Sequence, residues 1–84
     1  MTIDELNALA VDKVIDARGT ACPGPLLEAK KGIGAVKVGQ VIEVKSNDKG
    51  SRNDLAAWAG KIGHEFLGLV EAEGHDRLFL RRKK

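Results

Sequence analysis

Apolar residues alternate with polar ones in four short segments of this 84-residue chain, and the alternation predicts four β-strands. The four segments are residues 13–18, 40–45, 65–72 and 77–82. Two other segments carry apolar residues at helical spacing, one from Pro23 or Pro25 to Val36 and one from Ser51 to Ile62. The resulting order, β-α-β-α-β-β, predicts an α+β fold. We expect a two-layer sandwich in which two helices cover one face of a four-stranded mixed sheet.

Turn and cap residues separate these segments. Ser51 has a side chain typical of an N-cap and is predicted to begin the second helix, while Gly63 is predicted to cap its C-terminus. A turn is expected at residues 47–50, after the second strand. Residues 74–76, Gly-His-Asp, are predicted to form the tight turn between the last two strands.

The first twelve residues lie outside this pattern. Thr2 and Glu5 have the spacing of a capping box, which predicts a short helical turn. The apolar residues of this turn could share one face: Ile3, Leu6 and Leu9. Because an isolated helix this short is marginal in water, the pattern leaves open whether the segment is helical or frays. We therefore divide the chain into an N-terminal extension, residues 1–12, and a single domain, residues 13–84.

The distribution of charge argues against a nucleic-acid partner. The chain has 14 basic and 12 acidic residues, but four of the basic ones are the last four residues, 81–84. Without this tail, 10 basic residues face 12 acidic ones, whereas a nucleic-acid-binding face is usually basic over a wide area. Only three aromatic residues are present, too few for the stacking platforms of a single-strand binder. We interpret the tail as a solvated end, with steering of acidic partners or RNA as the alternative.

One short glycine motif has an RNA-binding counterpart. Residues 60–63, Gly-Lys-Ile-Gly, have the GxxG form with which KH domains bind RNA backbones. In a KH domain this loop joins two helices, whereas here it ends a predicted helix directly before a strand. We therefore interpret these glycines as helix-capping residues.

Cys22 is the only cysteine, which excludes an internal disulfide, a dithiol redox pair and a cysteine-rich zinc site. No basic segment followed by an apolar run predicts a secretory signal. No stretch reaches the roughly 18 apolar residues that a membrane span needs. We therefore expect a soluble, cytoplasmic protein with no membrane partner and no bound metal.

The residues around Cys22 predict that its sulfur lies at the start of a helix. A residue before proline is disfavoured in the α region, so Cys22 suits an N-cap and Pro23 suits the first helical position. Pro25 falls in the first turn, where backbone amides have no intrahelical acceptor. The positive end of the helix dipole favours the thiolate, which is the reactive form of cysteine. Arg18, and a lysine two turns downstream, could add positive potential.

Two kinds of chemistry are open to a lone exposed thiol. It can accept a sulfur atom as a persulfide and pass it to the thiol of another protein. It can also act as the nucleophile of an acyl transfer, for which His64 and His75 are the candidate bases. Both histidines adjoin predicted turns, and we interpret them as solvated surface residues. A buried, inert Cys22 is the alternative, but the neighbouring prolines and glycine favour a surface segment.

The surroundings of Cys22 make its motif specific. The stretch from Asp16 to Leu26, which contains Cys-Pro-Gly-Pro, closely resembles the signature of the TusA (SirA-like) sulfur-carrier family. Further matches lie at residues 39–44, 47–48, 54–58, 63–65 and 78–82. The resemblance runs from about residue 13 to residue 82, nearly the whole chain.

The resemblance implies a βαβαββ sandwich that carries sulfur. Such a protein accepts sulfane sulfur as a cysteine persulfide and passes it to a partner, in sulfur oxidation or in tRNA thiolation and cofactor sulfur delivery. It is a sulfurtransferase-type carrier without turnover on its own and without a cofactor. The implied partners are an acceptor protein and a donor, either a cysteine desulfurase or a rhodanese-type sulfurtransferase. The alternative is a small non-catalytic RNA-binding or adaptor module.

The resemblance also implies roles for residues near the motif. Cys22 would bear the persulfide, and Pro23 and Pro25 would shape its loop. The residues that approach the motif are expected to support it: Asp16, Arg18 and Gly19.

Two residues beyond the second strand complete the predicted site. Asp48 lies in the turn after that strand, and Arg52 follows shortly after it. Both are expected near the active face, where they would contact partner proteins rather than take part in the chemistry.

Overall fold

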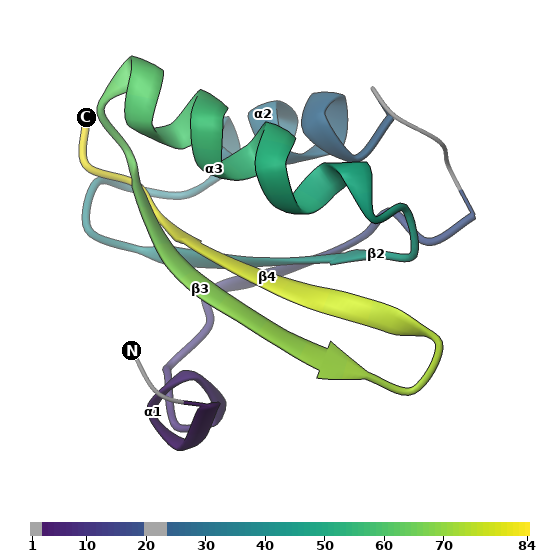
Figure 1. Ribbon diagram of the computed structural model, residues 1–84. Helices are drawn as coiled ribbons and strands as arrows, with labels where there is room; N and C mark the ends of the chain where they lie inside the picture. The colour runs from purple at the N-terminus through teal and green to yellow at the C-terminus, as the bar shows by residue number, and fades with distance from the viewer. Residues whose placement is uncertain (1–2, 20–23) are drawn as a thin grey trace.

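A computed structural model describes residues 3–19 and 24–84 of the chain (Figure 1). The strands are β1 (Lys13–Asp16), β2 (Val41–Ser46), β3 (Glu65–Ala72) and β4 (His75–Arg81). They form one sheet in the order β1-β2-β4-β3, with β1 parallel to β2 and the other neighbours antiparallel. The predicted four-stranded mixed sheet is therefore confirmed.

Within the described residues, three helices flank the sheet: α1 (Ile3–Asn7), α2 (Gly24–Ala35) and α3 (Gly50–Ile62). The helices α2 and α3 lie side by side over one face, as predicted, and α1 lies against the opposite face (Figure 1). None of the described helices is long and apolar enough to cross a membrane.

The alternation of side chains along the strands produces two apolar clusters. Beneath α2 and α3, the main cluster includes the fully buried Ile42, Val44 and Leu55. On the other face, a smaller cluster joins Leu6 of α1 to the buried Phe79 of β4. Because successive residues of a strand point to opposite faces, each strand of this sheet can contribute to both clusters.

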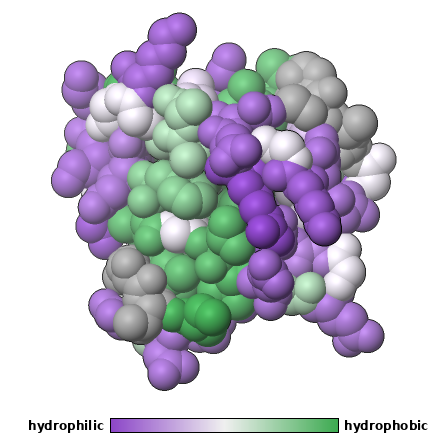
Figure 2. All heavy atoms as spheres, in the orientation of Figure 1, coloured by the Kyte–Doolittle hydropathy of each residue, from purple (hydrophilic) through white to green (hydrophobic). Residues whose placement is uncertain are grey.

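The strand β3 lies at one edge of the sheet, where some of its apolar side chains remain partly exposed. On the side of the molecule seen in Figure 1, apolar side chains gather over the first half of β3 and over α1, while polar side chains dominate elsewhere (Figure 2). Phe66 and Leu69 pack on the main cluster from this edge while remaining partly exposed. The edge strand therefore contributes to the main cluster with side chains that stay partly exposed.

Two glycines allow helices to approach the sheet closely. A Cβ atom on Gly32 of α2 would lie 1.9 Å from Cδ1 of Ile15 in β1, so only glycine fits here. In β3 the register shifts between Phe66 and Gly68, which is a β-bulge. Gly68 has φ +146°, and a Cβ atom there would lie 3.0 Å from Leu6 Cδ1. The bulge therefore makes room for α1.

The prediction that Ser51 begins α3 as its N-cap is wrong. The helix begins at Gly50, and its N-cap is Lys49, whose side chain makes no capping hydrogen bond. The Ser51 hydroxyl is buried and lies 3.0 Å from the buried hydroxyl of Ser46 at the end of β2. A buried hydroxyl without a partner is costly, so the two serines satisfy each other instead of one capping the helix. The predicted C-cap at Gly63 is confirmed, with φ +87°.

The predicted turn at residues 74–76 is replaced by a shorter turn at residues 73–74, so β4 begins two residues earlier than predicted. The strand β4 begins at His75, so only Glu73 and Gly74 lie between the paired residues Ala72 and His75. The last strand is therefore His75–Arg81 rather than residues 77–82. The pairing of Asp76 with Ser46 of β2 extends the ladder into the segment that was expected to turn.

Candidate functional site

Parallel pairing brings the predicted site residues to one end of the sheet. Asp16, the last residue of β1, pairs with Lys45 near the end of β2, so the segments that follow the two strands leave the sheet together. These segments lead to α2 and α3, whose N-terminal ends both lie at this end (Figure 1). The predicted persulfide residue Cys22 and its neighbour Pro23 lie outside the described residues.

Asp16 and Arg18 form a clamp directly after β1. Arg18 Nε donates to Asp16 Oδ1 at 2.9 Å, and Arg18 Nη2 donates to Asp16 Oδ2 at 2.8 Å. The backbone N–H of Arg18 also donates to Asp16 Oδ1. These hydrogen bonds hold the pKa of Asp16 far below its usual range. The charge of Arg18, which could add positive potential near Cys22, is thus paired with Asp16.

Gly19 is fixed by a residue that sequence reasoning did not assign. Its backbone N–H donates to Asn47 Oδ1 at 3.0 Å, and its φ of +85° lies in the left-handed region that favours glycine. Asn47 directly follows β2. Its place beside Asp48 after a buried strand was visible in the sequence, but the partner lies 28 residues away.

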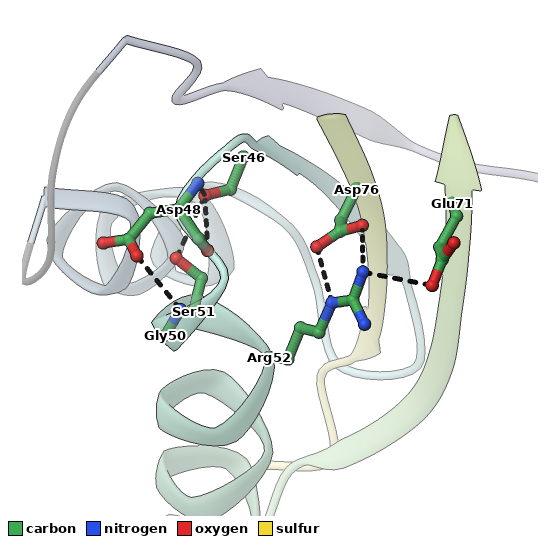
Figure 3. Close-up of polar contacts among 7 residues, drawn as sticks. All are labelled: Ser46, Asp48, Gly50, Ser51, Arg52, Glu71 and Asp76. Carbon is green, nitrogen blue, oxygen red and sulfur yellow. Dashed lines mark hydrogen bonds and ion pairs between the residues drawn. The ribbon is translucent and has the colours of Figure 1, made fainter. Parts of the chain in front are cut away.

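The turn between β2 and α3 is held from within (Figure 3). The N–H of Asp48 donates to the buried Ser46 hydroxyl, and the N–H of Gly50 donates to Asp48 Oδ1. The Ser46 and Ser51 hydroxyls then join the two ends of the turn. Asp48 therefore has a structural role in the turn, and Asn47 is placed between fixed neighbours.

The first turn of α2 has no acidic residue that would compensate the positive end of the helix dipole. The helix begins at Gly24, two residues after Cys22, and carries no acidic residue in its first turn. Pro25 is fully buried and anchors this end of the helix in the core. An anionic sulfur is stabilised at such a position.

Arg52 is tied to β3 and β4 by its carboxylate partners (Figure 3). Its Nε and Nη2 donate to the two carboxylate oxygens of Asp76 at 2.7 and 2.8 Å, and Nη2 also donates to Glu71 at 3.2 Å. The Asp76 hydrogen bonds raise the pKa of Arg52 further above its usual range. The carboxylate of Asp76 is buried, so Arg52 supplies the charge that this carboxylate needs.

We expect Arg52→Ala to lower Tm by roughly 10 °C, because it leaves the buried Asp76 carboxylate without its bidentate partner. The matched control is Arg81→Ala, which removes one ion pair with the more exposed Glu65 and should lower Tm by about 4 °C or less. The measurement is thermal unfolding followed by circular dichroism. Adding Asp76→Ala to Arg52→Ala should recover part of the loss, and equal losses for both arginines would contradict the assignment.

An open hollow lies beside this ion pair. Its volume is about 390 Å³, and its walls come from the turn before α3, the end of β3 and the start of β4. Asn47, Lys49 and His75 are among its lining residues. The hollow therefore adjoins the residue that holds Gly19.

The two histidines lie at opposite ends of the sheet. His75 is at the β3–β4 turn, and His64 follows the C-terminus of α3. His64 Nδ1 accepts a hydrogen bond from the backbone N–H of Lys83. Burial lowers the pKa of His64, and the charges of Arg82 and Lys84 lower it further. Among the described residues, no group of three or more His, Cys, Asp or Glu could hold a metal ion.

The basic tail is only partly the solvated end that we predicted. Arg82 Nη1 donates to the carbonyl oxygens of Ile33 and Val36 and so caps the C-terminus of α2. Arg81 pairs with Glu65 across the sheet. The GxxG segment ends α3 before β3, and it does not join two helices as the KH loop does. Neither feature therefore supports RNA binding.

Comparison with known proteins decides the family. The family described as "Sulfurtransferase TusA" matches residues 13–82, which run from the first residue of β1 to one residue beyond β4. The chain belongs to the TusA family. The resemblance drawn from the residues around Cys22 is thus confirmed, and α1 precedes the residues that match the TusA family.

Individual relatives agree with membership of the TusA family. YrkF of Bacillus subtilis is 51% identical over 70 residues, 82% of this chain, but the chain spans only 37% of the length of YrkF. "Sulfur carrier protein TusA" of Allochromatium vinosum is 37% identical over 71 residues, 84% of this chain and 93% of that protein. The crystal structure of a SirA-like protein from Desulfitobacterium hafniense has a TM-score of 0.75 at 27% identity, covering 86% of this chain and 99% of that one. Membership supports the sulfur-carrier function.

Proposed function

We propose that this chain carries sulfane sulfur as a persulfide on Cys22 and passes it from a donor protein to an acceptor protein. The observation that carries the proposal is the position of the chain's only cysteine two residues before α2, in a member of the TusA family. Because the first turn of α2 has no acidic residue, its dipole favours an anionic sulfur nearby. A lone thiol also has no second thiol in the chain with which the persulfide could collapse to a disulfide.

The transfer needs no external oxidant or reductant. The Cys22 thiolate attacks the terminal sulfur of a donor persulfide, a new S–S bond forms, and the donor leaves as a thiolate. In the second step an acceptor thiolate attacks the terminal sulfur of the Cys22 persulfide, and Cys22 leaves as a thiolate. Each step moves one sulfur atom and conserves both charge and oxidation state overall.

The partners are proteins on both sides of this exchange. The donor is a cysteine desulfurase or a rhodanese-type sulfurtransferase, and the acceptor serves sulfur oxidation, tRNA thiolation or cofactor sulfur delivery. The hollows found in the described part of the chain are open to solvent, so a docked partner has to supply the walls of the reaction site. This arrangement supports a carrier without turnover on its own, and we propose that it acts in the cytoplasm.

The test of this function is a change of mass at one residue. Wild-type protein incubated with sodium polysulfide should gain the mass of about one sulfur atom, located on the peptide that contains Cys22, and dithiothreitol should remove it. Cys22→Ser should show no gain, because the oxygen that replaces the sulfur cannot form a persulfide. Wild-type protein alkylated with iodoacetamide before incubation is the control. An equal gain in Cys22→Ser would overturn the proposal.

A further inference from the structure

We propose that Asn47 is a positioning residue for sulfur transfer, acting through Gly19 on the segment that carries Cys22. This inference rests on the proposed function of Cys22, and it adds a residue from a different part of the chain to the site. The hydrogen bond that carries it joins Asn47 Oδ1 to the backbone N–H of Gly19, three residues before Cys22.

The backbone at Gly19 depends on this contact. Its φ of +85° is strained for any residue with a Cβ atom, yet a Cβ atom there would meet nothing within 4 Å. A lack of room for a side chain therefore does not explain why a glycine occurs at this position. The backbone conformation does, because glycine adopts a positive φ at little cost, and it does so here at the residue whose N–H donates to Asn47 Oδ1.

Both partners of this hydrogen bond are held by the sheet. On the β1 side, the N–H of Ala17 continues the ladder to the carbonyl oxygen of Lys45 at 2.8 Å, and the Arg18–Asp16 clamp follows. On the β2 side, Asn47 lies between the buried Ser46 and Asp48, whose N–H is bound to the Ser46 hydroxyl. The contact thus joins two rigid supports and fixes the point from which the Cys22 segment departs.

The far end of the same segment is also anchored. The helix α2 begins at Gly24, and Pro25 is fully buried in the core. A reactive group must be held in a narrow range of positions, because a displacement of about 1 Å can reduce a rate by up to a hundredfold. Loss of the Asn47 contact would release one of the two ends while leaving the core intact.

The test compares three substitutions of exposed asparagines. Asn47→Ala removes the acceptor, Asn47→Asp retains an acceptor oxygen, and Asn53→Ala removes an exposed asparagine elsewhere, in α3. Each protein is loaded with sodium polysulfide, and the transfer of sulfur from Cys22 to glutathione is followed. We expect transfer about tenfold slower in Asn47→Ala and near wild-type rates in the other two. Tm should change by about 5 °C or less in all three.

A second readout separates positioning from stability. The rate at which iodoacetamide labels Cys22 is measured against pH for the unloaded proteins. In Asn47→Ala the midpoint of this profile should move to higher pH, because the positive end of α2 would stabilise the Cys22 thiolate less once the support at Gly19 is lost. Asn47→Asp should restore the wild-type midpoint.

Each outcome decides the matter. If Asn47→Ala transfers sulfur at the wild-type rate, or if its labelling profile is that of the wild type, or if Asn47→Asp is as slow as Asn47→Ala, the inference is overturned. If wild-type protein takes up no sulfur, the proposed function fails, while an unchanged labelling profile in Asn47→Ala would separately overturn the role of Asn47. Should Asn47→Ala not fold, Gly19→Ala strains the same backbone turn from the other side and must slow transfer for the inference to survive.

Discussion

Replacing Gly32 with valine should lower the free energy of unfolding by about 2–3 kcal/mol, because the new side chain has no room against β1. A Cβ atom at Gly32 would lie 1.9 Å from Ile15 Cδ1 and 2.9 Å from Ile15 Cγ1, well inside van der Waals contact. Ile15 is itself buried in the main cluster, so it cannot move aside without disturbing its neighbours. The expected loss is measured by urea denaturation followed by circular dichroism.

The same helix offers a matched control for this substitution. A Cβ atom at Gly34 would meet nothing within 4 Å, so Gly34→Val should change the free energy of unfolding by about 0.5 kcal/mol or less. Combining Gly32→Val with Ile15→Ala removes the two clashing carbons, and the double variant should lose less than the sum of the single losses. Additive losses, or similar losses at the two glycines, would show that α2 does not need its close approach to β1.

The elements of the fold could be predicted where the periodicity of apolar residues defines them. The strand β2 shows a run of Val and Ile bounded by turn residues, and β3 was predicted with its observed bounds, Glu65–Ala72. The error at Ser51 has a definite cause. Its hydroxyl could cap α3 or satisfy Ser46, and only the packed structure shows that Ser46 is buried close enough to compete.

The site residues close to Cys22 in the sequence could be predicted, but the contacts between residues far apart in the sequence could not. The residues beside Cys22 were found because their spacing carries the family motif, whereas Asn47 acts on Gly19 from 28 residues away. Arg52 was expected to contact partners, but its carboxylate partner Asp76 lies 24 residues away and was assigned to a turn. Arg82 was assigned to a solvated tail because nothing local links it to the end of α2. Such pairings depend on the order of strands, which local patterns do not contain.

Residues 3–12 precede the residues that match the TusA family. Their structure depends on packing against the sheet rather than on local sequence patterns. Leu6 of α1 is 2% exposed and contacts the bulge at Gly68. Two polar contacts support it, since Arg77 donates to Asn7 Oδ1 and Asp12 exchanges two hydrogen bonds with Val41. A helix of five residues would not persist alone in water, so its stability comes from these contacts.

Leu6→Ala should therefore lower the free energy of unfolding by about 2–4 kcal/mol, the usual range for a leucine lost from a core. The matched control is Ile3→Ala in the same helix, which removes a side chain that is 60% exposed and should cost about 0.5 kcal/mol or less. Urea denaturation gives both values, and amide hydrogen exchange should show faster exchange in α1 of Leu6→Ala alone. Equal costs for the two variants would mean that α1 contributes nothing to the second cluster. A large cost at Leu6 alone would show that α1 stabilises the domain, because Leu6 packs in the second cluster although it precedes residues 13–82, which match the TusA family.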